Sequence, residues 1–551
     1  MNRDLNASHQ ARAWTLLLIA CGIVWFAVLG LRPLFNPDEG RYAQIPAEML
    51  ASGDFTVPRL DGLVYLEKPP LQYWLTAAAL RLFGHNEWAA RLCTALSALT
   101  ALVFVYLLGA RAYSRERALM AASMTASMLL YVFMGQLITL DMTLACFLTI
   151  AVAAFALAQI ERDSASNRTR NWMLLCFAAM AAATLTKGLI GIVIPGAVLV
   201  LYTLWQRDFT AWKHLHLGTG LALYALLVLP WFALVERASP GALNFLIVHE
   251  HFERYLTKVH DRYQPWWYFL MILAAGSLPW LPQMARALLT GWHPTAARGH
   301  FDVNRLLWVS AAFTLLFFSL SDSKLAPYIV PVLPPLALLA AIDGAKGARD
   351  LKLSALLQLT GGASLVIAVF VYGRGGLEGE HAASYAALRP WALAISVALI
   401  ASGLLVLGLA SRNFGAAART LAAAGFGIAL TLIAGAATAV GSRYSAKSLL
   451  ALAGPLAPGA PLYSVGLYDW TLPFYTGRLV TPVAWRGELD FGLRLEPERA
   501  IAAIPDFAAR WRASESGYAL ITLPIHAGLV REGLEMRTLA QDFDNVLVSR
   551  R

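Results

Sequence analysis

The chain has 551 residues, of which 58% are hydrophobic and only 14% are charged, and its mean hydropathy is +0.57. These values exceed those of soluble proteins and exclude a soluble enzyme that carries a single membrane tail. The formal net charge of +10 does not indicate nucleic-acid binding, because the basic residues gather in loops on one side of the predicted membrane. We therefore expect a polytopic membrane protein with no nucleic-acid partner.

Stretches of about 20 mostly apolar residues predict the membrane spans. The weakest prediction is the pair at 172–206, which Lys187 and Gly188 divide. The sequence predicts a mainly α-helical protein of about 13 transmembrane helices, with a transmembrane domain at 1–440. The predicted spans are 13–33, 87–110, 118–136, 140–160, 172–186, 188–206, 215–235, 267–285, 304–320, 327–345, 354–373, 390–411 and 418–440.

The distribution of basic residues predicts the orientation of these spans. Loops on one side carry clusters of arginine and lysine, for example around Arg115 and Arg168. The positive-inside rule places such loops in the cytoplasm. An odd number of spans then puts the loops 34–86 and 236–266 and everything after 441 on the periplasmic side.

The pattern changes after residue 441. Short β-like runs occur at 461–467, 479–485 and 517–523, and 497–512 has helical periodicity. Alternation of strand, helix and strand predicts a small α/β domain at 441–551 on the periplasmic face. Its role is expected to be structural support or acceptor docking, because it has no obvious catalytic set.

The first periplasmic loop begins with a group of charged residues, Asp38, Glu39, Arg41 and Tyr42, directly after the first span. An Asp near a helix N-terminus often only caps backbone amides. Here 38–50 is amphipathic, so it predicts a helix along the membrane surface whose acids face a cavity. Ionisable groups at the bilayer edge are costly unless they bind something, which favours a site for a charged lipid headgroup.

A second charged element, Tyr65-Leu-Glu67-Lys68-Pro69-Pro70, follows in the same loop. An adjacent acid and base are usually ordinary surface residues. The two prolines fix the backbone after Lys68, and the residues that follow anchor at the membrane interface. A lysine held at that depth is predicted to bind a lipid phosphate as a point charge.

Two further residues lie at outward ends of predicted spans. Asp141 would be an unpaired carboxylate at the edge of the hydrocarbon, so it needs a cation, a set of hydrogen bonds or a substrate unless it is a helix cap. Tyr328 lies in a proline-rich span entry, where locally unwound backbone can line a cavity. We expect its hydroxyl in that cavity.

The loop 236–266 contains His249, His251 and Arg254. The two histidines, with Glu67 as a third ligand, could hold a divalent metal such as zinc, although a His-x-His pair does not share one helical face. Arg254 is the better candidate, as a phosphate ligand. No cofactor is required by the sequence.

Together these elements resemble the polyprenyl-phosphate-dependent glycosyltransferases of the GT-C fold, and most closely the bacterial lipid A aminoarabinose transferases, relatives of the protein O-mannosyltransferases. Pro46, inside the predicted surface helix, departs from the pattern of this family. The resemblance rests on Asp38-Glu39 with Arg41-Tyr42, Tyr65-Leu-Glu67-Lys68-Pro-Pro70, Asp141, Glu250-His251 with Arg254, and Ser323-Lys324 with Tyr328.

The resemblance implies transfer of 4-amino-4-deoxy-L-arabinose from undecaprenyl phosphate to a lipid A phosphate, at the periplasmic face of the bacterial inner membrane. We expect the chain to act as a monomer. The implied catalytic residues are Asp38, Glu39, Lys68 and Asp141, and the implied donor-binding residues are Lys68, Arg41, Arg254, Tyr328, Tyr65 and Tyr42. Two alternatives remain: a same-fold transferase with another sugar or with a protein or glycan acceptor, and a lipid flippase or transporter.

Overall fold

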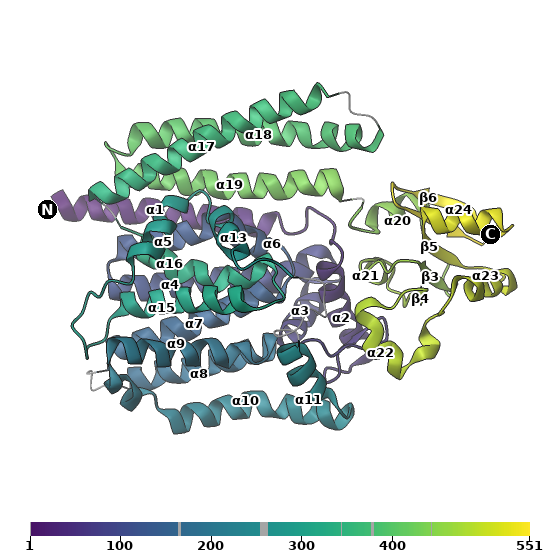
Figure 1. Cartoon of the computed structure of the whole chain (residues 1–551), viewed down its shortest axis with the longest axis horizontal. Helices are drawn as coiled ribbons and strands as arrows, with labels where there is room; N and C mark the ends of the chain where they lie inside the picture. The colour runs from purple at the N-terminus through teal and green to yellow at the C-terminus, as the bar shows by residue number, and fades with distance from the viewer. Residues whose placement is uncertain are drawn as a thin grey trace.

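A computed structural model describes residues 2–162, 167–253, 263–342, 344–375, 379–441 and 443–550. A bundle of helices forms the larger part, and a small α/β unit lies at one end of it (Figure 1). The long helices are α1 (Asn2–Ala27), α4 (Glu87–Ala112), α7 (Leu140–Ile160), α8 (Arg168–Lys187), α9 (Ile190–Gln206), α10 (Leu217–Ala238), α15 (Val303–Leu320), α17 (Gly344–Gly373), α18 (Gly379–Leu409) and α19 (Phe414–Val440).

Shorter elements complete the bundle. They are α5 (Arg115–Ser127), α6 (Leu129–Gln136), η1 (Phe209–His214), α11 (Ala242–Asn244), the π-helix η2 (Phe245–Glu253), α13 (Tyr268–Gly276), α14 (Leu281–Thr290), η3 (Ala326–Val332) and α16 (Leu333–Ala340). Two more helices, α2 (Asp38–Ser52) and α3 (Leu71–Phe83), lie between the bundle and the α/β unit (Figure 1). Between them in the chain is an antiparallel hairpin of β1 (Arg59–Leu60) and β2 (Leu63–Val64).

Among the described residues, eight helices are long and apolar enough to cross a membrane, or nine if the bent pair α5–α6 is one span. Every predicted span overlaps helical structure, although the first was predicted to run to residue 33 and α1 ends at Ala27. The four predicted spans that are not among these eight or nine are too short, too polar or interrupted: α8, α9, the segment split between α13 and α14, and the segment split between η3 and α16. Prolines explain the last break, because Pro331, Pro334 and Pro335 remove backbone donors within a few residues.

The depth of each helix in the bundle follows from its composition. The apolar window of α7 is 83% buried, as expected of a helix that is hydrophobic all round. The corresponding windows of α1 and α10 are only 17% and 22% buried, so most of their apolar surface faces outward, where lipid would lie. Helices α17, α18 and α19 form a layer along one side of the bundle (Figure 1).

The α/β unit contains the three predicted strands, which the structure confirms as β3 (Leu462–Val465), β4 (Thr481–Val483) and β5 (Tyr518–Thr522). They are parallel, with Tyr463 opposite both Thr481 and Ala519. Two antiparallel strands that the sequence did not predict, β7 (Asn545–Ser549) and β6 (Arg537–Gln541), extend the sheet to the order β4-β3-β5-β7-β6. The other helical elements are α20 (Lys447–Ala453), α21 (Leu472–Thr476), η4 (Gly487–Leu489), α22 (Asp490–Leu495), η5 (Pro497–Arg499), α23 (Ile504–Ala513) and α24 (Leu523–Arg531).

The α/β unit packs directly on α2. A Cβ atom at Gly40 would lie 2.5 Å from the carbonyl carbon of Trp470, so only glycine allows this approach. The Asn36 side chain donates a hydrogen bond to Asp469 at 2.8 Å, and the Val480 amide donates to Asp61 at 2.6 Å. This close contact places the loops of the α/β unit beside the first charged residues of α2.

Asp61 should make the stability of this contact depend on pH. Burial raises the pKa of Asp61 to about 8, although the hydrogen bond from Val480 opposes the rise. Between about pH 4 and pH 8 the unfolded chain therefore loses a proton that the folded chain keeps, and stability falls as the pH rises. We expect Asp61→Asn, which keeps an acceptor oxygen and tolerates the positive φ of 56°, to be more heat-stable than the wild type. The difference in Tm should be larger at pH 8 than at pH 5, and an equal difference at both pH values would contradict the prediction.

Candidate active site

Arg41 is the centre of the first cluster of charges. It lies on α2, is 4% exposed, and forms ion pairs with Asp38 on the same helix and with Glu488 of the α/β unit. Its guanidinium group also donates a hydrogen bond to the Tyr65 hydroxyl at 2.9 Å. The side chain of Asp38 is 45% exposed, so this carboxylate remains accessible to a substrate.

Glu39 lies apart from this cluster, and its contacts favour a structural role over the predicted catalytic one. Its side chain is 3% exposed and is bound by the guanidinium groups of Arg32 and Arg91, the latter at 2.8 and 2.9 Å. The amides of Phe35 and Ile138 also donate to it, each at 3.1 Å. Burial alone would raise the pKa of Glu39, but the two arginines outweigh burial and hold the pKa well below its usual range. The carboxylate thus joins the ends of α1, α4 and α6 to the start of α2.

Tyr42 lies among several acids. Burial raises the pKa of its phenol, and the nearby cation of Arg41 partly offsets this rise. The negative charges of three carboxylates add to the rise in pKa, those of Asp38, Glu67 and Asp141. These three carboxylates therefore all lie near Tyr42, although they come from different segments of the chain.

Lys68 is buried and forms an ion pair with Glu250 of η2. Its ammonium group also donates to the backbone carbonyl of Glu67 at 2.6 Å. The two prolines that follow lead directly into α3, a helix that the sequence did not predict, and they fix the backbone beside the lysine. The ammonium group is therefore held in place with little exposure to water.

Asp141 is paired with a cation that the sequence did not reveal as its partner. Lys187, the last residue of α8, forms a buried ion pair with Asp141 in the first turn of α7. The Lys187 ammonium group also lies 4.3 Å from the ring centre of Tyr328. Asp141, Lys187 and Tyr328 thus form one cluster at the end of the bundle that faces α2 and α3.

The predicted metal site falls largely outside what the structure describes. The side chains of His249 and His251 and the whole of Arg254 lie outside the described residues. Within the described part of the chain, no group of three or more metal-ligating side chains occurs. The zinc site and the Arg254 phosphate contact therefore stay predictions, and Glu67 is known only as a half-buried acid near Tyr42.

Three charged residues of these clusters were not predicted from the sequence as site residues. The sequence did contain a signal for Lys187, because a lysine inside an apolar stretch requires an opposite charge or a ligand. Glu250 stood in a recognised motif without a role, and it is the acid that pairs with Lys68. Glu488 had no signal, because it lies more than 400 residues from Arg41 in a segment with no motif.

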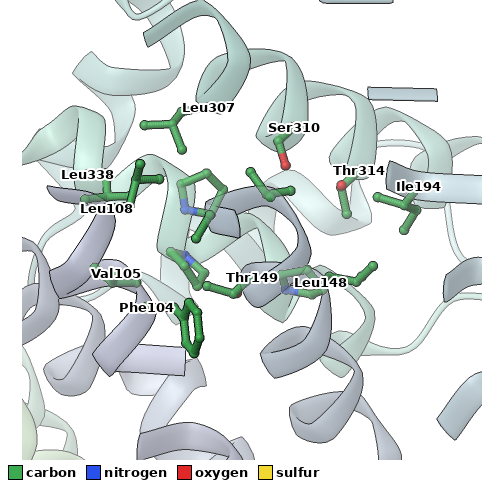
Figure 2. Close-up of a pocket in the computed structure, with 15 residues that line it drawn as sticks. Phe104, Val105, Leu108, Leu148, Thr149, Ile194, Leu307, Ser310, Thr314 and Leu338 are labelled. Carbon is green, nitrogen blue, oxygen red and sulfur yellow. The ribbon is translucent and has the colours of Figure 1, made fainter. Parts of the chain in front are cut away.

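An apolar pocket lies inside the bundle (Figure 2). Hydroxyl groups of Ser310 and Thr314 point into it, and the rest of the lining is almost wholly hydrocarbon. Such a lining suits an apolar chain and not a charged headgroup. The residues around it are Phe104, Val105, Leu108, Leu148, Thr149, Val152, Ala153, Ile194, Leu307, Ser310, Thr314, Pro331, Pro334, Pro335 and Leu338.

The arrangement of charges and spans defines a class of protein. Buried cations and their partner acids, of which Asp38 is partly exposed, meet at one end of a multi-span bundle beneath a small α/β unit. This is the architecture of a membrane transferase that acts on lipid-linked substrates. Family models agree with both parts of the chain. Residues 67–232 match the dolichyl-phosphate-mannose-protein mannosyltransferase model, and residues 450–550 match the aminoarabinose transferase C-terminal domain.

Individual relatives extend the match over the whole chain. An undecaprenyl phosphate-α-4-amino-4-deoxy-L-arabinose arabinosyl transferase of Pseudomonas paraeruginosa is 31% identical over 96% of each chain. The transferase of the same name from Erwinia tasmaniensis is 34% identical over 62% of each chain. The crystal structure of ArnT from Cupriavidus metallidurans bound to undecaprenyl phosphate is 31% identical, with a TM-score of 0.88 over 98% of each chain. The chain belongs to this family of aminoarabinose transferases, which are glycosyltransferases.

Proposed function

We propose that this chain, acting as a monomer, transfers 4-amino-4-deoxy-L-arabinose from undecaprenyl phosphate to a phosphate of lipid A. The observation that carries the proposal is the match to the Cupriavidus metallidurans structure over 98% of each chain, since that protein was crystallised with undecaprenyl phosphate. The clusters around Arg41, Lys68 and Asp141 lie at one end of the bundle, as a site for two membrane lipids requires.

The reaction breaks the bond between the sugar C1 and an oxygen of the prenyl phosphate, and the electron pair of that bond stays on the phosphate. A lipid A phosphate oxygen forms the new bond to C1. The leaving group needs positive charge and no proton, and Lys68, with Arg254 as the second predicted cation, is suited to supply it. A protein hydroxyl acceptor would instead require a general base.

Asp38 is the acid best placed to act on the sugar. It is the accessible member of the Arg41 cluster, whereas Glu39 forms ion pairs with two arginines and Asp141 forms one with Lys187. A lipid A phosphate is already ionised near neutral pH, so Asp38 need not act as a base. It stabilises positive charge on the sugar ring or its amino group, and Arg41 fixes its orientation.

Replacing Asp38 with asparagine is expected to lower kcat strongly and to change the KM for the donor little. The charge on the sugar grows toward the transition state, so losing the carboxylate affects the rate more than binding. Steady-state kinetics with purified enzyme and a prenyl-phosphate sugar would measure both constants. A rise in KM at unchanged kcat would instead show that Asp38 only binds the donor.

We propose that the clusters face the periplasm from the inner membrane, which follows from the positive-inside rule. A cysteine in place of the exposed Ser516, in a background without the four native thiols, is expected to react with an impermeant thiol reagent in intact spheroplasts. Ser411→Cys, in a loop of the opposite side, is the matched control and should react only after membranes are broken. The reverse pattern would contradict the orientation.

The mass of lipid A provides the direct test of function. Cells that contain the chain should carry lipid A with added aminoarabinose, and cells without it should not. Unchanged lipid A, with label from the prenyl-phosphate sugar found on protein, would point to the protein acceptor instead.

A further inference from the structure

The loop that follows β4, residues 484–488, is held in a defined shape beside the candidate active site. Ala484 has a φ of 52°, and its amide donates to the carbonyl of Ile501 at 2.9 Å. A Cβ atom on Gly487 would lie 2.3 Å from the ring of Trp485. The indole therefore folds back on its own loop, and only glycine leaves room for it.

Trp485 presents part of its ring at the surface of this loop. It stacks on the buried Tyr468, with ring centres 5.3 Å apart and planes 25° apart, and it meets the edge of the buried Trp470 at 5.7 Å. These contacts, together with Gly487, hold the indole in place, and the side chain nevertheless remains partly exposed. A fixed and partly open indole is a flat apolar surface that loses little conformational freedom on binding.

The loop is contiguous with the cluster that contains Asp38. The Arg41 guanidinium lies 5.4 Å from the ring centre of Trp470, against which Trp485 packs. Glu488, at the end of the loop, pairs with Arg41, and Arg41 in turn pairs with Asp38. The loop also follows the carboxyl end of β4, the edge strand of the parallel part of the sheet.

Arg486 adds a positive charge at the exposed side of the loop. Its side chain is 63% exposed and lies 3.4 Å from Asp490 of α22. A cation and an aromatic face side by side suit an anionic saccharide, because the ring covers the apolar face of a sugar and the guanidinium binds a phosphate.

We propose that residues 484–488 form a subsite for the acceptor, in which Trp485 stacks on a sugar ring and Arg486 binds a phosphate that does not react. This inference rests on the proposed function, since it assumes a phosphorylated saccharide acceptor at the Asp38 cluster. It gives the C-terminal unit a role in acceptor specificity, and the donor is bound by the membrane part.

A matched pair of arginine variants tests the subsite. Arg486 and Arg494 are both exposed, and both pair with Asp490, but only Arg486 belongs to the loop. Arg486→Ala is expected to raise the KM for lipid A roughly tenfold, as expected when one charge-assisted contact is lost, with the KM for the donor unchanged. Arg494→Ala should behave as the wild type. Equal KM values for lipid A in the two variants, or a rise in the donor KM alone, would overturn the subsite.

Trp485 is tested in the same assay with Trp485→Leu, which keeps an apolar side chain against Tyr468. The KM for lipid A should rise while undecaprenyl phosphate binding and Tm stay close to those of the wild type. Phe543→Leu, at an exposed aromatic of the same unit, is the control and should change neither constant. A lower Tm together with a normal KM for lipid A would make Trp485 a packing residue and overturn its role. If the wild-type enzyme transfers no sugar to lipid A, the proposed function itself is refuted. If the wild type is active and the variants have the same KM for lipid A, only the subsite is refuted.

Discussion

Replacing Lys68 with alanine is expected to lower the rate of transfer by roughly 10²–10³-fold, the cost of losing one preorganised contact to a developing charge. The ammonium group is buried and held by Glu250 and the Glu67 carbonyl, so it meets the leaving phosphate without first being freed from bulk water. Single-turnover rates with a prenyl-phosphate sugar and lipid A would measure the effect. Lys68→Arg should recover only part of the rate, because a planar fork does not replace a point charge.

Glu250 complicates the single variant, because Lys68→Ala removes the cation from a carboxylate that is 2% exposed. Loss of activity could then reflect a disturbed fold. The double variant Lys68→Ala/Glu250→Gln removes this conflict, and its Tm should exceed that of Lys68→Ala alone. If Lys68 serves the reaction, the double variant regains stability but not activity. Recovery of more than half of the wild-type rate would remove Lys68 from the proposed mechanism.

Local patterns of the sequence predicted the elements of the fold well. The amphipathic pattern of 38–50 gave the position of α2, and the short β-like runs after 441 gave β3, β4 and β5. Periodicity and hydropathy show which faces of a segment are apolar, so they indicate local structure without knowledge of the tertiary contacts. β6 was not predicted because it lies at the sheet edge and only one of its five residues, Ala540, is buried, so its sequence carries little apolar signal.

Pairings between distant residues were harder to predict. The sequence identified Asp141 as a charge in need of a partner, and Lys68 and Arg41 as ligands of the donor. The structure pairs them with Lys187, Glu250 and Glu488, which lie up to 447 residues away. A single sequence shows that a buried charge is costly and does not show which opposite charge offsets it. The adjacent acids of α2 illustrate the same limit. Successive helix positions point in different directions, so Asp38 is accessible and Glu39 is buried among arginines.

Replacing Arg91 with glutamine is expected to destabilise the protein by about 3–5 kcal/mol, because it breaks a buried ion pair and leaves part of the Glu39 charge uncompensated. Arg91 is fully buried and also donates to the carbonyls of Leu29, Arg32 and Pro33, which close the end of α1. The measurement is the thermal unfolding of purified protein in detergent. Arg81→Gln, at an exposed arginine on α3, is the control and should unfold like the wild type.

Glu39 completes the test, because the two roles considered for it predict opposite results. If Glu39 is the carboxylate that joins α1, α2, α4 and α6, Glu39→Gln should lower Tm by an amount similar to Arg91→Gln. The double variant should then lose less stability than the sum of the two single losses. As a catalytic acid, Glu39→Gln should fold with a normal Tm and lose only kcat. The two bidentate arginines and two backbone amides on this carboxylate favour the first result, since a group with every oxygen occupied has no lone pair left for a substrate. The acid pair of α2 would then divide into one residue for structure and one, Asp38, for chemistry.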